Sequence, residues 1–141
     1  MKKTVIFVIY LLSLTLLFGC AAAEQSPGKT VDFTNGLSEA DVWIIPETEA
    51  NRKTTVWGTA TASGVNSSES RAVPLCEPGG NGLYLFRMID SDGWFYSANS
   101  VNLKEGWSLQ IKGSDPEAIT LEVSDENGAV QNTYNVFAAR L

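Results

Sequence analysis

The sequence of 141 residues contains no histidine. Histidine is the commonest general base near neutral pH and the commonest metal ligand among side chains. Without it, Ser-His-Asp and Cys-His catalytic sites cannot form, and a zinc site would need carboxylates and cysteine alone. No motif selects a pair of carboxylates for a glycosidase-type site. We therefore predict a protein that is not an enzyme and has no cofactor, with a carboxylate-based enzyme as the catalytic alternative.

Basic residues are also few. The chain has 10 Lys and Arg against 16 Asp and Glu, for a formal net charge of −6, and the basic residues are scattered. An acidic chain without a basic patch repels phosphate backbones, so nucleic-acid binding is not expected. The same charge opposes direct binding of the folded domain to anionic lipid headgroups.

Cysteine occurs only at Cys20 and Cys76. An unpaired Cys76 would be either a reactive or intermolecular thiol or a small buried apolar residue at the end of a strand. With no histidine available to favour the thiolate, the buried residue is the preferred interpretation.

The first twenty residues have the layout of a secretory signal peptide, with Lys2 and Lys3 followed by an apolar run over 5–18. The run ends in Leu17-Phe18-Gly19-Cys20, which resembles the lipobox of bacterial lipoproteins. The resemblance implies cleavage before Cys20 and a diacylglycerol on its thiol. It also implies anchoring in the bacterial cell envelope, in the outer membrane if the host is Gram-negative, because Ala follows the cysteine.

Two other interpretations of this segment stay open. The apolar run over 5–23 approaches the ~20 residues that span a bilayer, so it could remain as an uncleaved anchor. Alternatively, an ordinary secretory signal could be cut at Ala21-Ala22-Ala23. Under the lipoprotein interpretation, 1–19 is the signal peptide, 20–30 is a lipidated flexible tether broken by Pro27-Gly28, and 31–141 is one folded domain.

No stretch after the signal has a sustained helical period, and Gly, Asn, Asp and Pro turns recur about every ten residues. The pattern predicts an all-β domain, a single antiparallel β-sandwich of about seven to nine short strands, with a small β-barrel as the alternative. We expect a bent or bulged strand, or alternatively an irregular crossing, over 54–61. We also expect a loop over 62–70, an edge strand over 71–76 and a central strand over 83–90. The chain over 129–138 is expected to form the last strand.

The stretch over 33–111 also resembles small bacterial envelope β-sandwich domains of unknown function. The resemblance rests on a strand that ends in Asn35-Gly36, the crossing at Trp57-Gly58, and an aromatic strand next to the turn at Asp90-Ser91-Asp92-Gly93. It implies the fold and carries no activity.

Asp90 and Asp92 are the metal candidates, because carboxylates two residues apart before a glycine begin many calcium loops. The next ligand position holds Trp94 and the twelfth holds Val101, so a complete loop is missing. The alternative is a hairpin turn in which aspartate accepts backbone N–H groups. We therefore predict no metal site.

Four tryptophans are the remaining signal. Aromatic rings stack on sugars and anchor protein interfaces, although most are buried in cores. Trp57 and Trp107, each next to glycine, are expected to be exposed, and Trp94 and Tyr96 are further binding candidates. The sequence thus predicts an envelope-anchored, non-enzymatic module that binds protein or glycan. The alternative is an accessory subunit of a larger envelope complex, with an exposed sheet edge or apolar patch for pairing with a partner strand.

Overall fold

The computed structural model describes residues 28–54, 58–78 and 80–141. Cys20 and Trp57 lie outside this part of the chain. The described residues form ten strands, a short helix and a 3₁₀ turn, in this order: β1 Thr30–Asn35, β2 Ala40–Pro46, α2 Glu49–Lys53, β3 Ala62–Val65, β4 Ser70–Pro74, β5 Tyr84–Asp90, β6 Trp94–Val101, β7 Ser108–Lys112, η1 Pro116–Ala118, β8 Thr120–Ser124, β9 Val130–Asn135 and β10 Phe137–Arg140.

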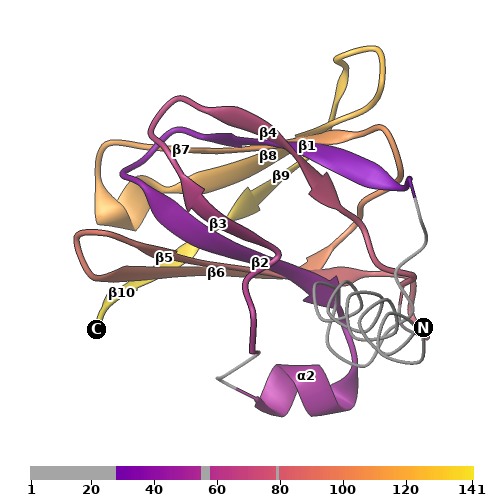
Figure 1. The fold of residues 1–141 in the computed structure, drawn as a ribbon, viewed down its shortest axis with the longest axis horizontal. Helices are drawn as coiled ribbons and strands as arrows, with labels where there is room; N and C mark the ends of the chain where they lie inside the picture. Colours follow the sequence, from indigo (N-terminus) through magenta and orange to yellow (C-terminus); the bar gives the residue numbers. More distant parts are fainter. Residues whose placement is uncertain (1–27, 55–57, 79) are drawn as a thin grey trace, which may run out of the picture.

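The strands form two five-stranded sheets that pack face to face (Figure 1). One sheet has the order β4-β1-β7-β8-β9 and the other has the order β10-β6-β5-β2-β3. All neighbouring strands are antiparallel except β1 and β7, which are parallel. The predicted all-β sandwich is therefore confirmed.

Alternation of apolar residues places one face of each sheet in the core. Phe33 of β1 and Phe86 of β5 meet across the two sheets, with ring centroids 5.8 Å apart, and both are fully buried. β5 is the middle strand of its sheet and is buried on both faces, as its continuous apolar sequence predicts. The strand predicted at the edge is also confirmed, because β4 ends its sheet.

Of the two conformations expected over 54–61, the described residues take the irregular crossing, and the loop predicted over 62–70 is wrong where it contains β3. Residues 58–61 are irregular, and β3 lies in the stretch over 62–70 that was predicted to be a loop. Gly58 has a φ of 67°, outside the range of strands, and the Thr61 hydroxyl accepts a hydrogen bond from Ile44 N–H at 3.0 Å. A side chain thus replaces the backbone acceptor that would have extended the sheet.

The last predicted strand is divided between the two sheets. The chain leaves the first sheet after β9 and joins the second as β10, and Val136 lies between the two strands. The Val136 N–H donates to Ile119 O at 3.0 Å, which fixes the crossing. Over residues 28–54, 58–78 and 80–141, no helix has the length and hydropathy required to span a membrane.

Candidate functional site

A cleft of about 400 Å³ opens at one end of the sandwich. Figure 1 shows the β5–β6 hairpin, the turn after β1, η1 and the C-terminus together at this end, on the left of the view. We call it the loop-end cleft, and it is lined by Gly36, Leu37, Ser38, Ser67, Asp90, Asp92, Trp94, Tyr96, Gly113, Ser114, Pro116 and Ile119.

The floor of the cleft is set by the Asn35-Gly36 pair after β1. Asn35 is fully buried, and its amide donates to Ser38 O at 2.8 Å and to Val65 O at 2.9 Å. Its side-chain oxygen accepts from Leu37 N–H at 2.9 Å, so this turn is fixed by one side chain. A Cβ on Gly36 would lie 2.4 Å from Ile111 O, so only glycine allows this close approach to β7.

Asp90 forms one wall and is 6% exposed. One carboxylate oxygen accepts from Asp92 N–H at 3.0 Å and Trp94 N–H at 2.9 Å, and the other accepts from the Tyr96 hydroxyl at 2.9 Å. Both oxygens therefore serve the hairpin turn. The described residues contain no group of three or more metal-ligating side chains.

Tyr96 is buried next to Asp90. Burial raises the pKa of its hydroxyl well above the usual value, and the hydrogen bond to Asp90 adds to the rise, because both disfavour the phenolate. Tyr96 is therefore a fixed hydrogen-bond donor in this wall and cannot act as a base near neutral pH.

Trp94 begins β6 and packs partly against the core while it lines the cleft. The Arg140 guanidinium lies 5.7 Å from the centroid of its ring, a cation–π contact that links the C-terminal strand to the cleft. Asp92 is exposed at the rim, and its carboxylate accepts from the Ser38 hydroxyl at 2.6 Å. The cleft thus combines an aromatic ring, a rim carboxylate and the hydroxyls of Ser67 and Ser114.

The structure brings together four residues that the sequence singled out, namely Trp94, Tyr96, Asp90 and Asp92. Sequence reasoning did not identify Ser38, Ser114 or Arg140. Ser38 lies 52 residues before Asp90 and Arg140 lies 48 residues after Asp92, so nothing in the sequence groups them with this hairpin. The sequence predicted turns where strands end at Asn35-Gly36 and at Gly113. That these turns lie next to one another is shown only by the order of the strands in the sheets.

The prediction that Trp107 is exposed is wrong. Trp107 is 8% exposed and belongs to the core, and its indole N–H donates to Glu126 Oε2 at 3.0 Å. The turn at 104–106 directly precedes β7, and the Lys104 ammonium lies over the Trp107 ring, 5.2 Å from its centroid. These contacts fix Trp107 as a structural residue.

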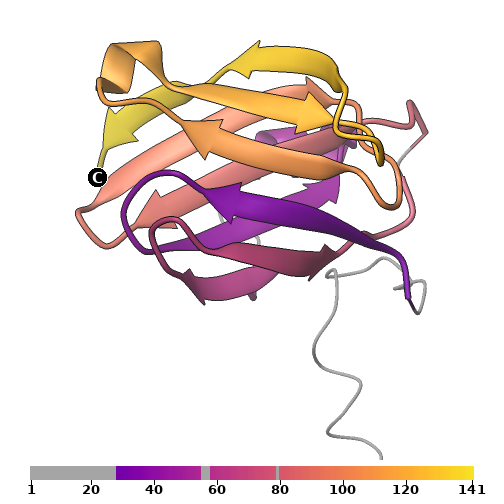
Figure 2. The same ribbon diagram turned by 90° about the horizontal axis from the view of Figure 1, so that it is seen from above.

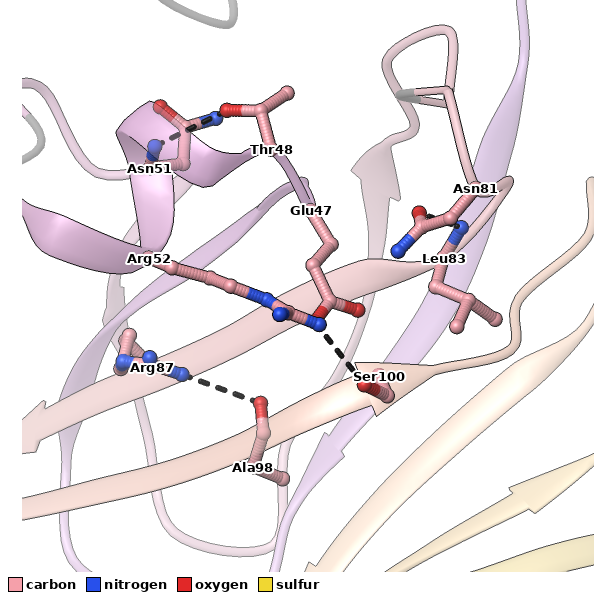
Figure 3. A network of polar contacts seen from close by, with 9 residues as sticks. All are labelled: Glu47, Thr48, Asn51, Arg52, Asn81, Leu83, Arg87, Ala98 and Ser100. Carbon is pink, nitrogen blue, oxygen red and sulfur yellow. Dashed lines mark hydrogen bonds and ion pairs between the residues drawn. The ribbon is translucent and has the colours of Figure 1, made fainter.

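A second polar cluster lies at the other end of β5 (Figure 3). The Glu47 side chain is fully buried, and its Oε1 accepts from the Arg52 guanidinium, with Arg52 Nε at 2.5 Å, and from the Ser100 hydroxyl at 3.0 Å. Within the described part of the chain, Glu47 Oε2 has no hydrogen-bond partner. Arg52 comes from α2, so this ion pair fastens the helix to the sheet.

Ser100 reaches Glu47 because β6 carries a bulge. Tyr84 pairs with Val101 but Phe86 pairs with Ala98, so β6 has one extra residue here, and Ser100 has a φ of 56°. Buried Arg87 donates to the carbonyls of Phe86 and Ala98, and burial lowers the pKa of its guanidinium while the Glu47 charge opposes that shift.

Cys76 is 1% exposed and its sulfur takes part in a disulfide. The predicted burial is confirmed, and the expectation of an unpaired thiol is wrong. The Tyr84 hydroxyl donates to Cys76 O at 2.6 Å, and burial together with the Glu77 charge raises the pKa of Tyr84 to about 12.

No family model, curated protein or solved structure matches this chain. The chemistry of the cleft therefore rests on its own residues.

Proposed function

We propose that this protein is a bacterial envelope lipoprotein whose loop-end cleft binds a neutral glycan without transforming it. The observation that carries the proposal is the joining of Trp94, Asp92 and several hydroxyls around a cleft of about 400 Å³. This volume is within the range of small-ligand sites, which are concave, partly apolar and carry a few converging polar groups.

The chemistry of the lining favours a sugar. An aromatic ring stacks on the apolar face of a pyranose, and a carboxylate accepts hydrogen bonds from its hydroxyls. Asp90 and Asp92 place negative charge at the cleft, so an anionic sugar is disfavoured by like-charge repulsion. Because Asp90 is already bonded to three donors, we assign ligand contact to Asp92 and Trp94 and assign Asp90 to the turn.

The lipobox resemblance of Leu17-Phe18-Gly19-Cys20 supports anchoring through lipid on Cys20, and the disulfide at Cys76 supports an oxidising location. A thioether to lipid and a disulfide to Cys76 use the same sulfur of Cys20, so they exclude each other in one molecule. In the anchored form, the disulfide partner of Cys76 would therefore be a cysteine of another chain.

Mass spectrometry of the membrane-extracted protein under non-reducing conditions distinguishes these forms. We expect an N-terminal peptide that begins at a lipid-modified Cys20, and loss of membrane association in Cys20→Ser. A peptide pair joined through Cys20 and Cys76, with no lipid-modified form, would contradict the anchor. Membrane retention of Cys20→Ser would indicate an uncleaved apolar segment instead.

Calorimetric titration tests the cleft, with chitotriose and maltotriose as neutral probes and trigalacturonate as the anionic probe. We expect a neutral probe to bind, Trp94→Ala to weaken it at least about tenfold, because stacking on one aromatic ring is lost, and trigalacturonate not to bind. Phe137→Ala is the matched control, since Phe137 is 65% exposed and does not line the cleft. Equal binding by wild type and Trp94→Ala would contradict the proposal.

The second candidate is a role as an accessory subunit of a larger envelope complex. It is supported by the edge strand β9, which carries no charged residue or proline to oppose pairing with a partner strand.

A further inference from the structure

The two sheets leave four edge strands, and they differ in how well each is protected. The edges are β4 and β9 in one sheet and β10 and β3 in the other. An edge strand presents unpaired backbone N–H and C=O groups, and proteins blunt such edges with charge, proline, bulges or short length.

Three edges carry such protection. β4 contains Arg71 and ends at Pro74, which has no N–H to donate. β3 has four residues and includes Gly64, whose φ of 60° interrupts the extended backbone. β10 also has four residues and ends at Arg140.

β9 carries a bulge of its own, but it lacks the charged, proline and glycine residues of the other three edges. Its six residues, VQNTYN, include no charge, proline or glycine, and five of the six are exposed. The register with β8 shifts between Val123 and Ser124, which leaves Gln131 as an extra residue and the stretch over 132–135 regular. Figure 2 shows this strand at the upper side of the sandwich, with no strand of the same sheet beyond it.

We propose that two copies of this chain pair through β9, antiparallel about a twofold axis, to join their β8-containing sheets into one. This proposal is independent of the glycan cleft. An isologous contact places each strand against itself, so residues near the axis face their own counterparts. At β4 or β10 such pairing would place two copies of Arg71 or of Arg140 in the contact.

At β9 the same operation brings only uncharged side chains together. With Thr133 on the axis, Thr133 faces Thr133 and Asn132 faces Tyr134, within the regular stretch over 132–135. Hydroxyl and amide side chains opposite one another stabilise a strand pair, and like charges destabilise it. In a chain of net charge −6, an uncharged edge is the place where two copies meet with least repulsion.

Sedimentation equilibrium of the full chain in density-matched detergent tests this pairing, with Thr133→Lys as the variant. Lys at this position faces Glu122 of β8, so the domain itself keeps its fold, which circular dichroism checks. We expect the wild type to form two-copy species and Thr133→Lys to weaken association at least about tenfold, because two ammonium groups then face each other. Added salt should partly restore pairing of the variant.

Ser63→Lys is the matched control, because it places the same charge at an exposed position of the edge strand β3. We expect it to associate as the wild type does. Three outcomes would overturn the proposal: a wild type that stays a single copy, a Thr133→Lys variant that pairs as well as the wild type, or a Ser63→Lys variant that fails equally. The first would leave β9 open to a strand of a different protein.

Discussion

Two buried carboxylates lie at opposite ends of β5, and they are satisfied in different ways. Asp90 is 6% exposed and shares its two oxygens among three donors, all within six residues of it. Glu47 is 2% exposed and directs one oxygen at Arg52 and Ser100, while the other has no hydrogen-bond partner among the described residues. The Asp90 carboxylate therefore completes a single hairpin turn, whereas the Glu47 carboxylate depends on contacts from both α2 and β6.

The difference separates a local constraint from a tertiary one. The donors of Asp90 follow it in one hairpin, so the turn forms as soon as β5 and β6 pair. Glu47 and Ser100 are 53 residues apart, and Arg52 must arrive with α2. The hairpin wall of the cleft is therefore fixed locally, and such preorganised groups suit ligand binding.

The largest effect is expected from Asp90→Ala. The change leaves two backbone N–H groups and the buried Tyr96 hydroxyl without their acceptor, so we expect a loss of about 4 kcal/mol in the free energy of unfolding. Urea titration measures it. Asp90→Asn keeps one acceptor oxygen and should lose about half as much. A loss under 1 kcal/mol for Asp90→Ala would show that the turn does not depend on this carboxylate.

Arg52→Ala should cost less, about 2 kcal/mol, because it leaves the buried Glu47 charge unpaired while water replaces part of the half-exposed guanidinium. Adding Glu47→Met removes that charge, so the double variant should regain at least half of the loss, as a double-mutant cycle in urea would show. Additive losses in the two single variants would mean that the pair does not hold α2 to the sheet.

The two buried tyrosines make stability sensitive to alkaline pH. Because the folded-state pKa values of Tyr84 and Tyr96 are raised, their contribution is complete below the unfolded value near 10 and is lost as pH rises through the folded values. We expect the free energy of unfolding to fall above pH 10, and to fall less in Tyr96→Phe and Tyr84→Phe. Equal slopes for all three proteins, from urea titrations between pH 9 and pH 12, would contradict the burial of these hydroxyls.

The smallest effect is expected at Ser100. Ser100→Ala loses the hydrogen bond to Glu47 but keeps the left-handed backbone, for a cost of about 1 kcal/mol. Ser100→Gly also loses the bond but relieves that backbone, so its stability should lie within about 0.5 kcal/mol of the wild type. Thermal unfolding ranks the two variants, and a less stable glycine variant would show that the bulge is not strained.

Much of the fold follows from local pattern. The continuous apolar run of β5, the Asn35-Gly36 turn and the aspartate hairpin each specify their own conformation, so the sandwich was predictable. Whether the stretch before β3 forms a bent strand or an irregular crossing could not be decided from the sequence, because the Thr61 hydroxyl bonds to a neighbouring strand. Division of the last strand depends on a contact with Ile119, which is distant in the sequence.

The candidate site was predictable only in part. Trp94, Tyr96 and the two aspartates belong to one hairpin, so sequence proximity grouped them. Ser38, Ser114 and Arg140 join them through sheet order, which single-sequence periodicity does not give. Trp107 was misassigned because Lys104 lies over its ring and its indole N–H bonds to Glu126 on another loop.

Amide and indole N–H shifts of the ¹⁵N-labelled protein, recorded during titration with chitotriose and maltotriose, test the glycan cleft most directly. We predict that a neutral probe shifts the Trp94 indole and the backbone N–H groups of Gly36 and Gly113, which line the cleft. The Trp107 indole, bonded to Glu126, should not move and serves as the internal control. Unchanged spectra with both probes, or shifts confined to residues outside the cleft, would contradict the account.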